Sequence, residues 1–484
     1  MPYQSTAASL SCILRKCVDK WSISRAKQAH AHVLITGLFH NVTLQTDLLL
    51  AYSKSGFLQY ARNMFDIMPQ RNMHSWNIMI SSYVQSSMFH DCFCVCSEFL
   101  KMGLHPDHYT LPPVFKACAA TGDFSLGLIL HTWVVRLGLE GYVVLGSSVL
   151  DFYVKCGHLT DAKQVFDGML WRDCIVWNSM ISGFGRAGFY VEALNLFREM
   201  LEEGVEIDSM SIPSILNACG REGDVMKGKE IHGRVVKIVL FDSDVAIGNS
   251  LIDMYSKCGC LCNSEKVFWK MKEWNLVTWT TMISCYGVHG RGNESLSLFD
   301  KMRDCGFEPN SVTLTAVLAS CSHSGLVDEG RQIFNSIGSV YAIEHSEEHY
   351  ACAVDLLGRM GCLEEAFGLI RDMKSVSTAS VWGALLAGCM MHKNVEIGEI
   401  AARHLFELEP RNSSNYIALS SIYDSLGMWS GVSRTRSLMR KLGLVKTPGC
   451  SWITIRGELH KFYQGDFKLH EISRILMMLI DDDY

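Results

Sequence analysis

Residues 174–208 read CIVWNSMISGFGRAGFYVEALNLFREMLEEGVEID, and this stretch decides the fold. Its apolar side chains recur every three or four residues in two runs: Trp177, Met180, Ile181 and Phe184, then Ala193, Leu194, Phe197 and Met200. This spacing predicts two amphipathic helices, and the glycines between Gly185 and Gly188 predict the turn that separates them. Because so short a helix pair cannot bury its apolar face alone, it must pack against similar neighbours.

The same pattern recurs along the chain, in the phrases SWNIMISSY, VWNSMISGF and TWTTMISCY. Three sets of residues keep a step of 101 or 102 residues: Trp76, Trp177 and Trp279; His30, His131 and His232; Cys118, Cys219 and Cys321. Each long period divides into helix pairs of roughly 35, 35 or 36, and 31 residues. Stacking such pairs buries a continuous core, so the sequence predicts an all-α solenoid in which the tryptophans and histidines pack internally.

Composition excludes several classes of protein. The chain has 484 residues, 48% of them hydrophobic, and a formal net charge of −6, which is typical of globular proteins and not of disordered ones. No uncharged apolar stretch is long enough to predict a membrane span. The 19 cysteines are odd in number and no signal-peptide pattern opens the sequence, so we expect reduced thiols inside a cell. The slight acidity argues against bulk electrostatic binding of nucleic acid but permits a locally basic groove.

Three phrases resemble a known family: NSLIDMYSKCG at 249–259, VTWTTMISCYGVHG at 277–290 and GKEIHGRVV at 228–236. They are similar to plant pentatricopeptide repeat (PPR) proteins of the class that alternates P, L and S motifs. The resemblance implies a right-handed α-solenoid superhelix of helix-turn-helix repeats over 7–378. The motifs that we expect are L 7–41, S 42–72, P 73–107, L 108–142, S 143–173, P 174–208, L 209–244, S 245–275, P 276–310, and variant L and S motifs at 311–346 and 347–378.

The C-terminal region changes character after residue 378. Residues 379–412 resemble the E1 motif of the family and 413–467 resemble its E2 motif, both tetratricopeptide-like helix pairs. Within E2, residues 451–463 alternate apolar and polar side chains around Gly457-Glu458, which predicts a small β-hairpin. A last helix is expected at about 468–480, within the C-terminal segment 468–484.

The resemblance implies that the fifth and last residues of each motif select one RNA base. Six such pairs are short and polar: Thr46/Asn72, Asn77/Asp107, Ser147/Asp173, Asn178/Asp208, Asn249/Asn275 and Thr280/Asn310. A carboxylate only accepts hydrogen bonds and suits U or G, whereas an amide can also donate and suits A or C. A compact fifth residue leaves room for a purine, and Asn leaves room for a pyrimidine. The pairs then specify A, U, G, U, C and A in chain order.

The remaining motifs have the pairs Ser11/Asn41, Pro112/Tyr142, Pro213/Asp244, Thr315/Ser346 and Ala351/Thr378, which we leave unassigned. The expected RNA, from 5′ to 3′, is ?-A-U-?-G-U-?-C-A-?-?. The second residue of each motif is expected to pack on the base faces, a role that suits Val144, Ile175, Val277 and Val312. His74, Thr43 and Met210 depart from this pattern, although His74 could stack on a base.

Plainer interpretations apply to several of these residues. An Asn or Asp ahead of a helix is also a favoured capping residue, so each last residue could serve only as an N-cap. Cys258, Cys260 and Cys262 lack the usual metal-ligand spacing, and Cys92, Cys94 and Cys96 are expected to point to different faces of one helix. We therefore expect no metal and no cofactor.

The sequence gives little support to an enzymatic function. A deaminase of the type found in some relatives needs H-x-E and P-C-x-x-C. His345-Ser346-Glu347 is the only H-x-E match that invites comparison, and the sequence contains no C-x-x-C and ends before such a domain would fit. The resemblance therefore implies a non-catalytic factor that recognises single-stranded organellar RNA for C-to-U editing and recruits a DYW-type deaminase in trans.

Other functions and partners stay open. The recruiting surface is expected at 379–467, and further organellar editing factors could bind there; no membrane partner is expected. Splicing or transcript-stability factors and a peptide-binding tetratricopeptide scaffold are the alternatives. The acid-poor N-terminus, in which Asp19 is the first acidic residue, and the family suggest a mitochondrion first and a chloroplast second.

Overall fold

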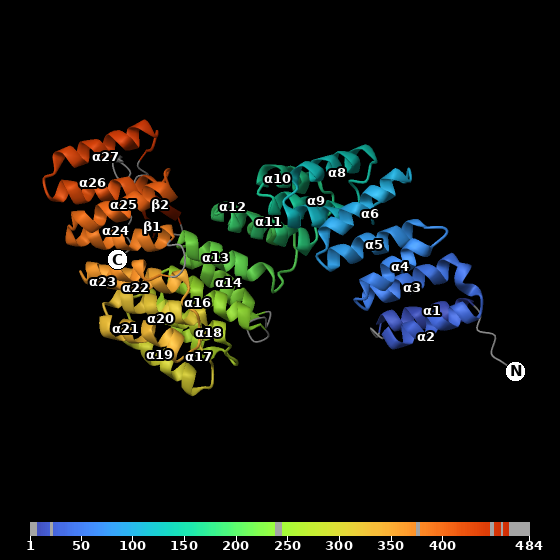
Figure 1. Cartoon of the computed structure of the whole chain (residues 1–484), viewed down its shortest axis with the longest axis horizontal. Helices are drawn as coiled ribbons and strands as arrows, with labels where there is room; N and C mark the ends of the chain where they lie inside the picture. Colours follow the sequence, from blue (N-terminus) through green and yellow to red (C-terminus); the bar gives the residue numbers. More distant parts are fainter. Residues whose placement is uncertain are drawn as a thin grey trace. The chain divides into compact units, whose positions relative to one another are not determined.

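A computed structural model of the chain describes residues 7–19, 23–237, 244–373, 378–445, 450–455 and 458–463 (Figure 1). Within these residues the regular structure is helical apart from one pair of strands near the C-terminus. The chain forms two compact units, Met1–Ser211 and Ile212–Tyr484. No described helix is both long and apolar enough to cross a membrane.

The first unit is a stack of helix pairs, coloured blue to green in Figure 1. Its helices are α1 (Ala7–Asp19), α2 (Ile23–Ile35), α3 (Val42–Lys54), α4 (Leu58–Ile67), α5 (Met73–Gln85), α6 (Phe89–Lys101), α7 (Leu111–Thr121), α8 (Phe124–Arg136), α9 (Val143–Lys155), α10 (Leu159–Gly168), α11 (Cys174–Arg186) and α12 (Tyr190–Glu202), with a 3-10 turn η1 (Leu38–His40). The odd-numbered helices contact one another in order from α1 to α11, so they form one layer of the unit.

The second unit continues the pattern. Its helices are α13 (Ser211–Glu222), α14 (Val225–Lys237), α16 (Val245–Lys257), α17 (Leu261–Lys270), α18 (Leu276–Val288), α19 (Gly292–Asp304), α20 (Ser311–Ser324), α21 (Val327–Ser339), α22 (Glu347–Arg359), α23 (Leu363–Arg371), α24 (Ala379–His392), α25 (Val395–Leu408), α26 (Ser413–Ser425) and α27 (Trp429–Lys441). The even-numbered helices from α16 to α26 contact one another in order and form a comparable layer.

The recurring tryptophans join each helix pair to its neighbour. Trp76, Trp177 and Trp279 are at most 1% exposed, and each indole packs edge-on against a phenylalanine from the preceding pair. The three contacts are Trp76 with Phe65 at 4.7 Å between ring centroids, Trp177 with Phe166 at 4.7 Å and Trp279 with Phe268 at 5.3 Å. Aromatic pairs of this geometry add to the free energy of apolar burial, so the predicted internal role of the tryptophans is confirmed.

The recurring histidines do more than pack. Each ring Nδ1 lies within hydrogen-bond distance of a tyrosine hydroxyl in the next helix pair: His30 with Tyr52 at 2.8 Å, His131 with Tyr153 at 2.8 Å and His232 with Tyr255 at 2.9 Å. Burial lowers the pKa of all three histidines from the ordinary value of 6.5. Each His–Tyr hydrogen bond therefore links two neighbouring helix pairs, and burial of the imidazole favours its neutral form.

Two glycines show where small residues are required. A Cβ atom at Gly127 in α8 would lie 2.0 Å from Cζ of Phe152 in α9, so only glycine allows these helices to approach so closely. Gly188 has a φ of 84° and forms the turn after α11. Gly185 lies inside α11 instead of the turn, because the helix continues to Arg186.

The strands β1 (Cys450–Ile455) and β2 (Glu458–Tyr463) pair antiparallel, with Ile455 opposite Glu458. The predicted hairpin is thus confirmed, although Glu458 belongs to the strand and not to the turn. The helix expected at 468–480 lies outside the described residues. Helices begin at the predicted motif starts 42, 73, 143, 174, 245, 276, 311, 347, 379 and 413, while the division into P, L and S motifs stays a prediction.

Candidate nucleic-acid interface

All six predicted last residues cap backbone N–H groups at the start of a helix. The N-cap residues with side-chain capping bonds are Asn72 of α5, Asp173 of α11, Asn275 of α18 and Asn310 of α20. Asp107 accepts from the N–H groups of Tyr109 and Thr110, just ahead of α7, and Asp208 accepts from those of Met210 and Ser211. The capping interpretation therefore holds for the whole set.

Because one side-chain oxygen of each capping Asn or Asp accepts the capping bonds, the other polar atom of that side chain lies outside them. The Asn72 side-chain oxygen accepts from Ser75 N at 2.8 Å, and only the oxygen of an amide can accept, so the orientation of Nδ2 is set. At Asp107 the hydrogen bonds from Asn77, Tyr109 and Thr110 all end on Oδ1. A capping Asn therefore leaves a donor, whereas a capping Asp leaves an acceptor.

The structure brings three of the predicted pairs together directly. Nδ2 of Asn178 donates to both carboxylate oxygens of Asp208, at 2.9 and 3.0 Å. The distance from Asn77 Nδ2 to Asp107 Oδ1 is 3.3 Å, and that from Asn72 Nδ2 to Thr46 Oγ1 is 3.4 Å. In these motifs the fifth and last residues form one polar unit on the layer of first helices.

The other three pairs are arranged differently. The Thr280 and Thr313 hydroxyls lie 2.8 Å apart, and Thr313 donates to Asn310 Oδ1 at 2.9 Å, so Thr280 and Asn310 are linked through one hydroxyl. Within the described residues Ser147 donates to Val144 O and not to Asp173. The buried Oδ1 of Asn249 has no hydrogen-bond partner among the described residues.

Two of the carboxylates are held ionised. Burial acts to raise the pKa of Asp107, but hydrogen bonds from Thr110, the N–H of Tyr109 and Asn77 outweigh it and lower the pKa below its ordinary value. Asp208 behaves in the same way, because bonds from Cys174, Ser211 and Asn178 outweigh its burial and lower its pKa. Both groups are therefore acceptor-only near neutral pH, as recognition of a ring N–H requires.

The four predicted base-packing residues are exposed apolar side chains. Val144, Ile175, Val277 and Val312 are between 59% and 70% exposed, although each lies on a helix whose other face is buried. The residues that depart from the aliphatic pattern at this second position, His74, Thr43 and Met210, are exposed as well. All four side chains are therefore accessible, as a role in packing on base faces would require.

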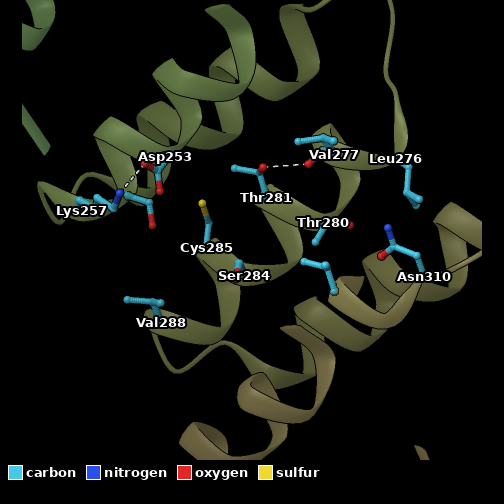
Figure 2. Close-up of a pocket in the computed structure, with 12 residues that line it drawn as sticks. Asp253, Lys257, Leu276, Val277, Thr280, Thr281, Ser284, Cys285, Val288 and Asn310 are labelled. Atoms are coloured by element: carbon cyan, nitrogen blue, oxygen red, sulfur yellow. Dashed lines mark hydrogen bonds and ion pairs between the residues drawn. The ribbon is translucent and has the colours of Figure 1, made fainter. Parts of the chain in front are cut away.

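Grooves run beside these residues on the same helices. A groove of about 380 Å³ in the second unit is lined by Val277, Thr280, Asn310 and Val312 among others. Figure 2 labels Val277, Thr280 and Asn310 among the side chains that line it. A groove of about 430 Å³ in the first unit is lined in part by Ser147 and Ile175, and one of about 590 Å³ by His74, Asn77 and Tyr109. Predicted base-reading and packing residues therefore line common surfaces.

Each groove also contains a lysine that the sequence analysis did not single out. Lys54, Lys155 and Lys257 line the grooves of about 590, 430 and 380 Å³, and they repeat at steps of 101 and 102 residues. Lys155 pairs with Asp151 at 2.7 Å and Lys257 with Asp253 at 2.6 Å (Figure 2). Such partly exposed pairs contribute little to stability. The sequence indicates these lysines through the repeated phrases YSKSG at 52–56, YVKCG at 153–157 and YSKCG at 255–259.

The residues considered for metal binding do not form a ligand set. His345 Nε2 is bonded to the carbonyl of Phe334 at 3.0 Å, and Ser346 caps α22. Cys92 and Cys96 lie one turn apart on the same side of α6, where Cys92 is buried, so the expectation that these cysteines diverge was wrong for this pair. No group of three or more His, Cys, Asp or Glu residues in the described part of the chain could hold a metal ion.

Helix pairs in series, stacked in each of the two units, define the class of helical-repeat solenoids. The PPR repeat matches residues 46–73, 74–104, 147–174, 175–205, 249–276, 312–339 and 348–377, and the PPR repeat family matches 275–323. The E motif family matches 392–454.

Curated relatives in Arabidopsis thaliana agree with these matches. One pentatricopeptide repeat-containing protein is 39% identical over 84% of this chain and 56% of its own length. A mitochondrial one is 36% identical over 98% of this chain and 73% of its own length. The chloroplastic protein CRR2 is 35% identical over 96% of this chain and 72% of its own. The chain belongs to the pentatricopeptide repeat family and carries an E motif.

Solved structures show the same fold. The pentatricopeptide repeat protein PPR10, in complex with an 18-nt psaJ RNA element, matches with a TM-score of 0.67 at 16% identity, over 91% of this chain and 70% of that one. Another structure of PPR10, from maize, matches with a TM-score of 0.54 at 16% identity over the same shares of the two chains. At this level of identity the likeness concerns the helical solenoid itself.

Proposed function

We propose that this protein binds single-stranded RNA in a sequence-specific manner and marks sites for C-to-U editing in an organelle. The proposal rests on three features that recur together at the first helix of successive helix pairs. They are a capping Asn or Asp with one polar atom outside the capping bonds, a short polar fifth residue beside it in several motifs, and an exposed aliphatic side chain nearby. A row of this kind suits successive unstacked bases.

The recognition follows from the chemistry of the pairs. Asp107 and Asp208 offer acceptors to the N3–H of uracil, while Asn72 and Asn310 offer donors to the ring nitrogen of adenine. The exposed Val and Ile side chains would pack on base faces, and the groove lysines would meet the backbone phosphates. The PPR10 structure bound to an RNA element supports the choice of ligand.

The C-terminal helices support the editing role. The family match over 392–454 corresponds to an E motif, and the resemblance to proteins with alternating P, L and S motifs implies that such a region recruits a DYW-type deaminase supplied by another protein. The edited cytidine would then lie a few nucleotides 3′ of the base that faces 347–378. Relatives named mitochondrial and chloroplastic support an organelle, with the mitochondrion as our first choice.

The proposal is tested by reconstitution. The purified chain, a DYW-type deaminase domain and an RNA carrying ?AU?GU?CA?? with a downstream cytidine are incubated together, and conversion to uridine is measured by sequencing. Conversion that requires the chain and the matching RNA is the expected result. Tight, specific binding without conversion would favour the splicing or stability role, because that role needs recognition but no deaminase.

A further inference from the structure

The predicted motif 108–142 carries aromatic rings at its first, second and last positions, and the last position is polar in every other predicted motif. Its fifth residue, Pro112, has no side-chain hydrogen-bonding group. Its last residue, Tyr142, precedes α9 but makes no side-chain capping bond within the described part of the chain. The fourth nucleotide of the expected RNA therefore faces no pair of the kind expected to read the others.

Three rings occupy this place instead. His108 and Tyr142 are stacked, with ring centroids 4.0 Å apart and an angle of 8° between their planes. Tyr109 lies against the same imidazole, with centroids 4.1 Å apart and an angle of 41°. We call His108, Tyr109 and Tyr142 the aromatic shelf. Tyr109 is 66% exposed and Tyr142 is 44% exposed, so much of the ring surface faces solvent.

The aromatic shelf is continuous with the row of candidate base-reading groups. The N–H of Tyr109 donates to Asp107 Oδ1 at 2.9 Å, and the Tyr109 side chain lines the same groove as His74 and Asn77. At its other end, Tyr142 directly precedes α9, the helix that bears Ser147. The shelf thus lies between the residues expected to read the third and the fifth nucleotides.

We propose that the aromatic shelf binds the fourth nucleotide by stacking on its base, without selecting which base it is. The proposal rests on the RNA-binding function proposed above. Rings stack on any base because every base has a π-face, and such stacking is sequence-tolerant. The motif would then hold the RNA in register between two specific contacts while adding affinity of its own.

The test removes the base and the rings in turn. RNA ?AU?GU?CA?? is made with a normal fourth nucleotide or an abasic one, and its affinity for the wild-type chain and for the Tyr109→Ala/Tyr142→Ala variant is measured at fixed salt. Both tyrosines are exposed, so the variant should fold, which circular dichroism and the thermal midpoint would verify. An abasic seventh nucleotide is the matched control, because the predicted motif 209–244 has the non-aromatic Met210 at its second position.

For the wild-type chain, loss of the fourth base should weaken binding about 5- to 140-fold, which corresponds to about 1–3 kcal/mol at 1.4 kcal/mol per tenfold. The variant should lose the same factor on intact RNA and nothing more on abasic RNA. Exchange among the four bases at this position should change wild-type affinity much less.

A spectroscopic signature separates stacking from a general loss of structure. With 2-aminopurine as the fourth nucleotide, binding by the wild-type chain should quench its fluorescence, and the variant should bind without that quenching. Equal losses on intact and abasic RNA, or unchanged quenching in the variant, would overturn the aromatic shelf while leaving RNA recognition intact. Failure of the wild-type chain to prefer this RNA over a scramble would instead refute the proposed function, and the shelf with it.

Discussion

Substitution of Asp208 by Asn should change the base that the chain prefers at the sixth nucleotide from U to C. Oδ1 of Asp208 accepts from the N–H groups of Met210 and Ser211, and an Asn side chain keeps that oxygen and the capping bonds. The substitution replaces Oδ2 by an amide nitrogen, so an acceptor becomes a donor. N3 of uracil carries a hydrogen, whereas N3 of cytosine accepts one.

The neighbouring side chain must respond to the same change. In the wild-type chain Nδ2 of Asn178 donates to both oxygens of Asp208, and Asn178 Oδ1 is buried without a partner among the described residues. Rotation of the Asn178 amide would let that oxygen accept from the new amide group at position 208 and relieve the unpaired acceptor. This rearrangement replaces the two bonds from Asn178 Nδ2 by one to Asn178 Oδ1 and gives up the bond from Cys174 Sγ to Oδ2. The capping bonds on Oδ1 remain, so the variant should still fold.

The magnitude follows from a single good edge contact, worth about 1–3 kcal/mol or roughly 5- to 140-fold in affinity. Fluorescence anisotropy with RNAs that differ only in U or C at the sixth nucleotide measures the ratio of dissociation constants at fixed salt. The wild-type ratio should favour U, and that of the variant should favour C by a comparable factor. Asp107→Asn is the control, since it should switch the third nucleotide and leave the sixth unchanged. A variant that still prefers U with undiminished affinity would refute the pairing scheme.

Three further results are expected. Asn178→Thr should shift the preference at the sixth nucleotide from U towards G, because the shorter side chain leaves room for a purine; binding assays across the four bases would show it, and a retained preference for U would contradict it. Gly127→Ala should lower the free energy of unfolding by about 1–3 kcal/mol through a clash with Phe152, whereas Gly168→Ala, whose Cβ meets no described atom within 4 Å, should not; urea titration compares the two. Burial lowers the pKa of His131, so the free energy of unfolding should be largest above about pH 6.5 and should fall as the pH drops below it. His131→Gln should reduce that fall, and an unchanged dependence of the free energy of unfolding on pH would exclude His131 as its source.

Much of the fold follows from sequence because each repeat is local. Trp177 and its partners in 174–208 are spaced so regularly that the first helix of this motif begins at the predicted residue, Cys174. The agreement is not general, because α7 begins at Leu111 and α13 at Ser211, after the predicted motif starts at 108 and 209. Long-range pairing is harder to foresee. The hydrogen bond between His131 and Tyr153 crosses from one helix pair to the next, and no spacing rule within one pair identifies it.

In the candidate site, too, the local features follow from the sequence and the atomic contacts do not. The capping positions of Asn72 and Asp173 follow from the helix starts, whereas the choice of Oδ1 for capping at Asp107, which leaves Oδ2, depends on atomic geometry. The lysines could have been found from their period. The aromatic shelf could not, because the stacking of His108 on Tyr142 joins residues 34 positions apart.

The central claim is that the periodic pairs read RNA, and one binding measurement tests it most directly. Purified protein is titrated at fixed salt with single-stranded RNA carrying ?AU?GU?CA??, with a scrambled RNA of the same composition and with the equivalent DNA. The account predicts clear preference for the designed RNA over both competitors. Equal binding to the scramble, or no binding to any of the three, would contradict the claim and favour a peptide-binding scaffold.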